Sequence, residues 1–389
     1  MTRIRSTTTF SFPSFRTRTT ADAGERPRFL GWGPRGTSGA SIPAQLAFEG
    51  VTQRYGDTRA LDSVTLTIRP GEIVCLLGHS GCGKTTLLRV AAGVESPVEG
   101  RVLLDGREVS GPKLFLPPEQ RGIGLMFQDY ALFPHLTILD NVLFGLKALP
   151  AADAQVAARR ALSRVGLEGY AADYPHTLSG GEQQRVALAR SIAPRPGVLL
   201  MDEPFSNLDR RMRDAIRDET IAILRETGAT TIVVTHDPEE AMRIADRIVL
   251  MRSGALVQQG TAEDVYRRPA DLFAARFFCD FNEVEGRVRG GRVDTPIGAF
   301  PAPSMAEGEA AIVCLRPQGV RLKPPGFCLP GRVVSRRFLG EVDLVQVAVQ
   351  GLDRPLQARV RAQKPVRPGE DVGVDVDPDE ILVFAAGRP

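Results

Sequence analysis

The chain has 389 residues, of which 43% are hydrophobic and 24% are charged, and its formal net charge is +3. A charge this small gives no reason to expect a nucleic-acid partner. No apolar run reaches the length that a membrane span needs, so we expect any pore to belong to other chains. The five cysteines lack CxxC spacing, which indicates neither a zinc site nor a disulfide framework and suits a reducing cytoplasm.

Residues 1–44 differ in composition from the rest of the chain. They are rich in Ser, Thr, Arg, Gly and Pro, carry seven arginines and have almost no apolar block. A secretory signal needs an apolar core segment, which this stretch lacks. We therefore expect a disordered N-terminal extension without a function of its own. The alternative is that the sequence is read from a start codon upstream of the true one.

A glycine-rich loop follows the first buried strand that the sequence predicts. The apolar run 72–77 is short and bounded by Gly and Pro, which is typical of such a strand, and 83–92 is expected to be a helix. Glycines let successive N–H groups of the loop turn toward one anion, and the helix N-terminus adds a positive dipole end. Lys84 supplies a charge for the outer phosphates, and the Thr85 hydroxyl can bind Mg²⁺. The loop consists of Gly78, His79, Ser80, Gly81, Cys82, Gly83, Lys84, Thr85 and Thr86.

Two adjacent carboxylates, Asp202 and Glu203, follow a second predicted buried strand at 198–201. Ligands of an open α/β sheet gather beyond the carboxyl ends of its strands, so we expect Asp202 to hold magnesium-bound water near the loop. Glu203 points in a different direction and can orient or deprotonate an attacking water. A solvated acidic turn before Pro204 is the alternative for this segment alone.

Three further side chains are candidates for the same site. The predicted strand 231–235 delivers His236, for which contact with a γ-phosphate is favoured over a structural role. The predicted strand 123–127 delivers Gln128, which could reach the metal or the water, although a Gln after a strand has little meaning by itself. Tyr55 lies in a predicted hairpin region, where stacking on an adenine ring and a half-buried strand position are equal alternatives.

The segment 178–185, with the sequence Leu-Ser-Gly-Gly-Glu-Gln-Gln-Arg, leads into a helix with one predicted apolar face. Its Ser179, Gly180 and Gly181 offer a second helix N-terminus with small side chains and a hydroxyl, which suits another phosphate contact. One γ-phosphate cannot use this site and the glycine-rich loop of the same chain unless the two face each other. Two copies that pair head to tail about a twofold axis would bring the two sites together.

With these residues in this order, the stretch 46–278 resembles the ATP-binding subunits of ABC transporters. The resemblance implies an α/β P-loop NTPase fold of ABC type, with a mixed sheet and a helical signature subdomain. It implies hydrolysis of ATP with Mg²⁺ in a homodimer, where each ATP lies between one chain's loop and the other chain's signature 178–185. The implied catalytic residues are Glu203, His236 and Gln128, and the implied metal ligands are Thr85, Gln128 and Asp202. The implied nucleotide contacts are Tyr55, the loop residues Gly78 to Thr86, Ser179, Gly180, Gly181 and Asp209.

From residue 280 onward the sequence changes to short β-like runs broken by Gly and Pro. The expected strands are 284–288, 311–315, 342–349, 356–360 and 381–384, and a small all-β barrel is their natural closure. The runs 314–322 and 331–340 resemble the TOBE-type accessory domain of bacterial importers, which favours an importer over an exporter. The predicted organisation is therefore an extension at 1–44, an ABC ATPase domain at 45–280 and a β-rich TOBE-like domain at 281–389.

The resemblance also implies a location and partners. The subunit would lie peripherally on the cytoplasmic face of the inner membrane and energise import through separate permease subunits, serving a periplasmic solute-binding protein indirectly. The segments 123–146 and 277–288 are most similar to ferric-ion importer subunits, with polyamine, sulfate and phosphonate importers as alternatives.

A second hypothesis makes the C-terminal domain a ligand sensor that inhibits the ATPase. A third hypothesis is a soluble ABC ATPase that acts on DNA or ribosomes. It is disfavoured because the interval between the glycine-rich loop and the signature is too short for a long coiled coil, and because the chain has a single ATPase module.

The segment 130–142 is a candidate for contact with the permease. We expect a helix to begin near Thr137 and the preceding loop to expose Tyr130, Phe133 and His135. In the family that the chain resembles, this region receives a coupling helix from the permease. A loop packed on its own helices is the alternative.

Overall fold

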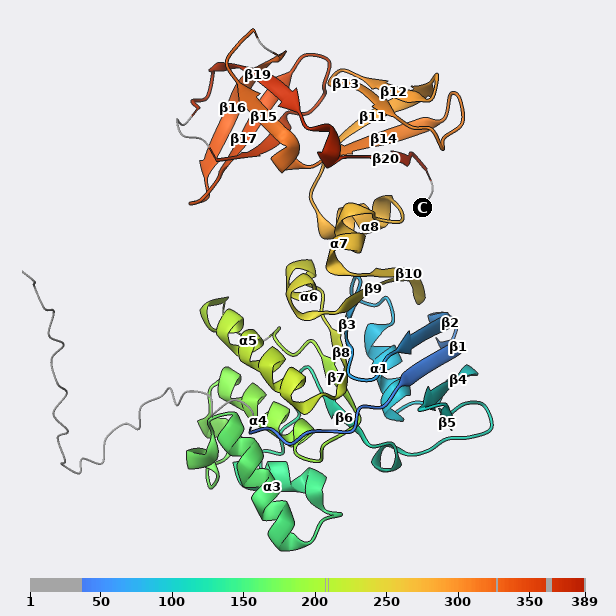
Figure 1. The fold of residues 1–389 in the computed structure, drawn as a ribbon, viewed down its shortest axis with the longest axis vertical. Helices are drawn as coiled ribbons and strands as arrows, with labels where there is room; N and C mark the ends of the chain where they lie inside the picture. The colour runs from blue at the N-terminus through green and yellow to red at the C-terminus, as the bar shows by residue number, and fades with distance from the viewer. Residues whose placement is uncertain (1–36, 207, 209, 327, 362–365, 388–389) are drawn as a thin grey trace, which may run out of the picture.

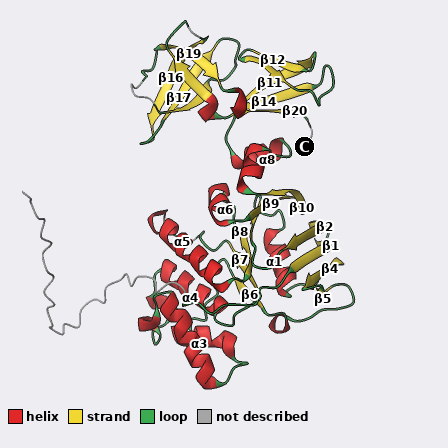
Figure 2. Cartoon of the chain, viewed as in Figure 1, coloured by secondary structure: helices red, strands yellow, loops and turns green. Residues whose placement is uncertain are grey.

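The computed structural model describes residues 37–387 except 207, 209, 327 and 362–365, and it describes Arg210 and Arg211 by their backbone alone. Most of the predicted extension 1–44 thus lies outside the described residues, as does the predicted nucleotide contact at Asp209. Figure 1 and Figure 2 show two parts, one of helices and sheets through residue 278 and one built of strands from residue 282 onward. Among the described residues, no helix is both long enough and apolar enough to cross a membrane.

A six-stranded sheet forms the centre of the first part. Its strands are β3 (Ile73–Leu77), β6 (Ile123–Met126), β7 (Val198–Asp202), β8 (Thr230–Val234), β9 (Arg247–Arg252) and β10 (Ala255–Gly260). They are arranged in the order β10-β9-β3-β8-β7-β6, and all neighbours are parallel except β10 and β9. Every residue of β3, β7 and β8 is buried, because this sheet is covered on both faces.

Helices α2 to α6 cover one face of this sheet. Helix α1 and a second sheet cover the other face. The helices are α1 (Lys84–Ala92), α2 (Ile138–Leu143), α3 (Ala151–Arg164), α4 (Gly180–Ile192), α5 (Arg210–Thr227) and α6 (Pro238–Ile244). The second sheet is antiparallel, has the order β2-β1-β4-β5 and consists of β1 (Leu46–Tyr55), β2 (Thr58–Ile68), β4 (Glu99–Leu104) and β5 (Arg107–Ser110). Short 3-10 helices lie at Pro118–Gln120, Phe144–Leu146, Glu168–Tyr170 and Pro175–Thr177.

Alternate residues of β3 face two separate cores. Ile73, Cys75 and Leu77 pack in a core with residues of α2 to α6. Val74 and Leu76 pack in the other core with α1 and the antiparallel sheet. α1, which begins in the glycine-rich loop, and α4, which begins in the signature, therefore lie on opposite faces of the central sheet. The α/β fold with a mixed sheet and a helical subdomain, predicted from the sequence, is confirmed.

The loop before α2 differs in one respect from the expectation. Phe133 is half-buried and His135 is exposed, but Tyr130 is only 4% exposed and belongs to the helical core. The prediction that Tyr130 is exposed is wrong because the backbone at Tyr130 and Ala131 is left-handed, with φ of 62° and 42°, which turns the chain at this point. The helix itself begins where predicted, since the Thr137 hydroxyl caps α2 by accepting from the N–H of Asp140.

The described end of the predicted extension runs along the helical subdomain. Ser41 donates from its backbone N–H to the carbonyl of Thr227 at 2.8 Å, and Ala44 donates likewise to Gly197 at 3.2 Å. The Arg160 guanidinium donates to the carbonyl of Thr37 at 2.6 Å. These bonds fix residues 37–44 beside α3 and the start of β7.

Two helices, α7 (Ala262–Arg267) and α8 (Leu272–Phe278), lead into the second part, which has two five-stranded antiparallel sheets. One sheet has the order β13-β12-β11-β14-β20, with β11 (Asn282–Arg289), β12 (Arg292–Thr295), β13 (Gly298–Pro301), β14 (Ala310–Leu315) and β20 (Ile381–Ala385). The other has the order β15-β19-β16-β17-β18, with β15 (Val320–Lys323), β16 (Leu329–Phe338), β17 (Asp343–Val349), β18 (Leu356–Val360) and β19 (Asp371–Val376). Both sheets contribute to one hydrophobic core, as the predicted barrel-like closure requires, but in the described residues they remain two separate ladders.

Candidate active site

The glycine-rich loop connects β3 to α1, as the sequence predicts. Gly78 and Gly83 have φ of 150° and 105°, and a Cβ at these positions would collide with the carbonyl oxygens of Met251 and Ala60. Only glycine fits both conformations in so little space. The buried Lys84 side chain curls back over the loop, where its ammonium donates to the carbonyls of Gly78 at 2.7 Å and His79 at 3.0 Å.

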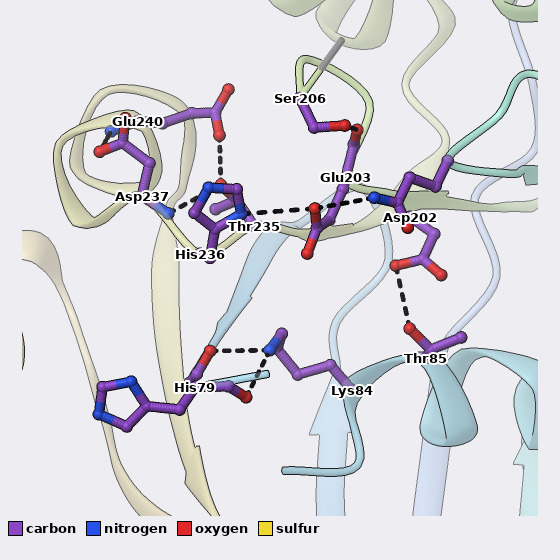
Figure 3. A network of polar contacts seen from close by, with 12 residues as sticks. His79, Lys84, Thr85, Asp202, Glu203, Ser206, Thr235, His236, Asp237 and Glu240 are labelled. Atoms are coloured by element: carbon purple, nitrogen blue, oxygen red, sulfur yellow. Dashed lines mark hydrogen bonds and ion pairs between the residues drawn. The ribbon is translucent and has the colours of Figure 1, made fainter. Parts of the chain in front are cut away.

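The side chains of the loop point in different directions. The His79 ring points away from Lys84 (Figure 3) and packs edge-on against Phe273 and Phe277 of α8, with ring centroids 5.6 and 5.3 Å apart. The loop residue Cys82 is buried, with its sulfur 3.7 Å from the Lys84 nitrogen. His79 remains exposed although its ring contacts α8. Ser80, Gly81 and Thr85 are exposed, and Gly83 and Thr86 are half-buried.

Asp202 and Thr85 meet at the carboxyl end of β7. The Thr85 hydroxyl donates to Oδ1 of Asp202 at 3.3 Å (Figure 3), and Asp202 is only 8% exposed. Burial raises the pKa of Asp202 above its ordinary value, although the hydrogen bond from Thr85 opposes the shift. Ionising the Asp202 carboxylate in this buried place therefore costs free energy.

Two side chains from the adjoining strands contact the Glu203 carboxylate. Gln128 donates from its amide nitrogen to Oε2 of Glu203 at 3.3 Å, and Nδ1 of His236 lies 3.4 Å from the same oxygen. The backbone of Glu203 is left-handed, with φ of 44°, and its N–H donates to the carbonyl of Val234 at 3.0 Å. Gln128 after β6 and His236 after β8 thus meet at one oxygen of Glu203, which follows β7.

A small cavity of about 40 Å³ opens beside Glu203. This volume is enough for a water molecule. Its lining residues are Glu203, Phe205, Ser206, Arg213, Thr235, His236, Asp237 and Glu240. The sequence did not single out Arg213, Thr235 or Glu240. The only signal was the Asp-Pro-Glu-Glu run at 237–240, which is typical of an exposed helix start.

Ser179 is the N-cap of the signature helix α4. It forms a capping box with Glu182, in which the Ser179 N–H donates to the Glu182 carboxylate at 2.8 Å and the Glu182 N–H donates to the Ser179 hydroxyl at 3.4 Å. Gly180 is exposed, whereas Gly181 is buried and a Cβ there would lie 3.0 Å from Ile216. The signature is therefore an ordered helix start with a free surface at Ser179 and Gly180.

Tyr55, at the end of β1, is 46% exposed, and its hydroxyl donates to Glu95. Partial burial and the bond to Glu95 raise the pKa of Tyr55, while a hydrogen bond with Thr86 lowers it. The contact with Thr86 places the hydroxyl beside the start of α1. The ring is half-exposed next to the loop, which suits both alternatives that the sequence left open.

The chain matches the family model of the ABC transporter over residues 61–206 and that of the TOBE domain over residues 313–384. It is 43% identical over 344 residues to the Fe(3+) ions import ATP-binding protein FbpC of Streptomyces coelicolor, covering 88% of this chain and 97% of the relative. It is 40% identical over 360 residues to the sulfate/thiosulfate import ATP-binding protein CysA 2 of Chromobacterium violaceum, covering 89% and 96%. It is 39% identical over 335 residues to the putrescine transport ATP-binding protein PotG of Escherichia coli, covering 82% and 88%.

The first part is also similar to a solved dimeric structure of MJ0796, a bacterial ABC transporter cassette. The TM-score is 0.50 at 33% identity, and the match covers 56% of this chain and 98% of that one. The region that matches the ABC transporter family model includes the glycine-rich loop, the signature, and Asp202 and Glu203 at the end of β7. The chain therefore belongs to the ABC transporter family, as an ATP-hydrolysing import subunit with a C-terminal TOBE domain.

Proposed function

We propose that the chain hydrolyses magnesium-bound ATP at the carboxyl edge of its central sheet. The observation that carries this proposal is the meeting of Gln128, Glu203 and His236 at one oxygen, next to the contact between Thr85 and Asp202. Glu203 takes the proton of the attacking water. Gln128 and His236 keep the Glu203 carboxylate in place, and the exposed His236 ring can reach the γ-phosphate.

The N–H groups of the loop and the Lys84 ammonium bind the phosphates. Lys84 already lies across the loop, held by two backbone carbonyls, so its charge is in position before a nucleotide arrives. This preorganisation lowers the cost of binding the phosphates. The half-exposed ring of Tyr55 stacks on the adenine.

Thr85 and Asp202 fit a magnesium ion. Mg²⁺ prefers oxygen ligands and uses one or two carboxylates together with substrate phosphates and water. Within the described ranges no three or more His, Cys, Asp or Glu side chains form a metal cluster, so phosphates would complete the coordination. When bound, the ion neutralises charge that develops on the transferred phosphoryl group. Its charge would also offset the cost of burying an ionised Asp202.

A second copy of the chain completes the site through Ser179, Gly180 and Gly181. α1 and α4 pack on opposite faces of one chain's sheet, and the free surface of the signature helix is available to another chain's nucleotide. Small residues and a hydroxyl at a helix start suit a γ-phosphate. A head-to-tail pair with twofold symmetry would bury two ATP molecules between two chains.

The test of the catalytic assignment is Glu203→Gln with Glu263→Gln as a matched control on the exposed surface of α7. We expect Glu203→Gln to lower kcat by about 10²- to 10⁴-fold, the usual worth of a general base, and to leave ATP affinity nearly unchanged. Glu263→Gln should behave as the wild type. Turnover of Glu203→Gln within twofold of the wild type would refute the assignment.

The imported solute that we propose is ferric iron. The relative from Streptomyces coelicolor carries that assignment at 43% identity, and the relatives named for sulfate and putrescine are 40% and 39% identical. The subunit would act on the cytoplasmic face of the inner membrane, under a permease that receives iron from a periplasmic binding protein. Uptake of radiolabelled iron, sulfate and putrescine should be compared in cells that lack the gene and are complemented with wild type or with Glu203→Gln. Loss of sulfate or putrescine uptake with normal iron uptake would overturn the choice of iron.

A further inference from the structure

Glu240, in the first turn of α6, is a buried carboxylate for which the proposed mechanism has no role. Its side chain is only 6% exposed, and one of its oxygens, Oε1, has no protein partner among the described residues. Burying a carboxylate is costly unless hydrogen bonds or opposite charges compensate for the lost water. A charged group in this position therefore requires a physical reason.

The contacts of Glu240 form a closed set of hydrogen bonds with residues 235 and 237, which flank His236 in the chain. The hydroxyl of Thr235 donates to Oε2 of Glu240, and the same hydroxyl accepts from the N–H of Asp237 at 3.1 Å. The Asp237 carboxylate in turn accepts from the N–H groups of Glu239 at 2.9 Å and Glu240 at 3.2 Å. Residues 235 and 237 are thus fixed on both sides of His236 (Figure 3), which is itself exposed.

The charges around Glu240 come from three elements. Burial raises its pKa and Asp237, the N-cap of α6, raises it further, whereas the Thr235 hydroxyl and the α5 residues Arg213 and Arg217 lower it. On β3, the buried Cys75 lies close enough for Glu240 to raise the pKa of its thiol. Burial is the largest of these effects, so the pKa of Glu240 is raised overall, and the hydroxyl and the two arginines only partly oppose the shift.

Glu240 also shares a cavity with the catalytic carboxylate. The cavity of about 40 Å³ beside Glu203 is lined by Thr235, Arg213 and Glu240 as well as His236. Arg213 donates to the carbonyl of Leu208, in the segment between Glu203 and α5. The loop after β7, the loop after β8 and the start of α5 are therefore tied together around Glu240.

We propose that Glu240 is a positioning residue for ATP hydrolysis, which acts through the Thr235 hydroxyl to hold the 235–237 loop so that His236 stays against Glu203. The proposal rests on the proposed function, because it assigns the effect to His236. Thr235 is the connecting group, and Glu240 fixes the direction in which its hydroxyl points. Without these hydrogen bonds among residues 235, 237 and 240, the His236 backbone is free to move away, and the 3.4 Å contact between His236 and Glu203 is lost.

The test uses Thr235→Val, which removes the hydroxyl at nearly constant shape, and Thr235→Ser, which keeps it. We expect Thr235→Val to lower kcat about tenfold with little change in KM for ATP, the scale expected when a reacting group is slightly misplaced. Thr235→Ser should retain most of the activity. Glu240→Gln, which keeps an acceptor oxygen of similar size, should lie between the two, and it serves as the second variant if Thr235→Val folds poorly.

A double-mutant cycle separates positioning from general loss of structure. In a His236→Ala background, Thr235→Val should have almost no further effect on the residual turnover, because both changes remove the same interaction. If Thr235→Val lowered turnover by the same factor in the wild type and in the His236→Ala background, the proposal would be overturned. If His236→Ala keeps full turnover, the proposed role of His236 fails. If His236→Ala is impaired and Thr235→Val and Glu240→Gln are not, this inference alone fails.

The histidine NMR signals give a readout that does not need turnover. The chain has four histidines, so the ring signal of His236 can be identified by its loss in His236→Ala. Thr235→Val and Glu240→Gln should shift or broaden this signal and leave the signals of His79, His135 and His176 in place. An unchanged His236 signal in both variants would contradict the proposal.

Discussion

At the scale of single residues, Asp202 and Glu203 differ because the backbone turns between them. Asp202 ends β7, is buried and contacts Thr85. Glu203 adopts a left-handed conformation, which is uncommon for a residue with a side chain and is often found at functional sites. The turn sends the two carboxylates in different directions, one toward the proposed metal position and the other toward the proposed position of the attacking water.

Asp202→Asn should stabilise the protein in the absence of nucleotide and Mg²⁺. Because burial raises the pKa of Asp202 in the folded state, its contribution to stability is present below its ordinary pKa and is lost as the pH rises through the raised value. At neutral pH the ionised side chain therefore costs free energy, and asparagine removes the charge. We expect a gain of about 1 kcal/mol, measured by thermal unfolding at pH 7.

The pH dependence supplies the control for Asp202→Asn. The gain should shrink in acid, where Asp202 is protonated and resembles the amide. ATPase activity should be lost, because the variant lacks the carboxylate that fits Mg²⁺. A melting temperature below that of the wild type at neutral pH would show that the carboxylate is well compensated without a cation.

At the scale of elements, the start of α4 combines two roles in Ser179. The side chain caps the helix within the chain, and its surface is proposed to meet the partner's γ-phosphate. A loss of activity in a Ser179 variant is therefore ambiguous by itself. Glu182, the other half of the capping box, supplies the matched comparison.

Ser179→Ala and Glu182→Ala should each destabilise the protein by about 1 kcal/mol, since each breaks the capping box. Only Ser179→Ala should lower kcat severalfold at saturating ATP, because Glu182 is not proposed to touch the nucleotide. Urea unfolding and steady-state ATPase assays measure the two effects. Equal losses of activity in both variants would assign Ser179 to capping alone.

Arg164 joins two helices of the first part. The fully buried guanidinium at the end of α3 donates to Glu226 of α5 through Nε at 3.0 Å and Nη2 at 2.7 Å, and Glu219 lies 3.4 Å away. Arg164→Ala should destabilise the protein by about 3–5 kcal/mol, because it removes a buried guanidinium that bonds two poorly solvated carboxylates. The exposed neighbour Arg159 is the control, and Arg159→Ala should change the urea midpoint very little. Equal midpoints for the two variants would contradict this account.

The elements of the first part follow closely from the sequence. The predicted strand at 198–201 extends by one residue into β7, and the predicted helix at 83–92 differs from α1 only by its cap Gly83. Such runs are predictable because a strand buried on both faces must be apolar throughout. Arg164 and Glu240 were not recognised because charged residues are usually exposed, and their burial depends on partners far away in the sequence.

The surroundings of the site were less predictable than its members. The sequence placed Gln128, Glu203 and His236 at one sheet edge, and the structure brings them to a single oxygen. It did not predict that the His79 ring packs on α8, or that Tyr130 is buried. Both depend on tertiary contacts and local backbone turns that carry no signal in a motif.

At the scale of the whole molecule, the glycine-rich loop is in direct contact with α8, one of the two helices that lead to the TOBE domain. His79 of the loop packs on Phe273 and Phe277 of α8. On the other side, Gln318 of the second part donates to the hydroxyl of Tyr266 on α7 at 2.9 Å. α7 and α8 therefore contact both parts of the chain (Figure 1).

The central claim is that each ATP is bound by the loop of one chain and the signature of another. It is tested most directly by measuring the mass of Glu203→Gln in solution with ATP, using size exclusion with light scattering. We predict the mass of two chains with ATP and of one chain with ADP. Adding Ser179→Arg should return the mass to one chain while ATP still binds to the loop. A single-chain mass for Glu203→Gln saturated with ATP, or a dimer that survives Ser179→Arg, would contradict the shared site.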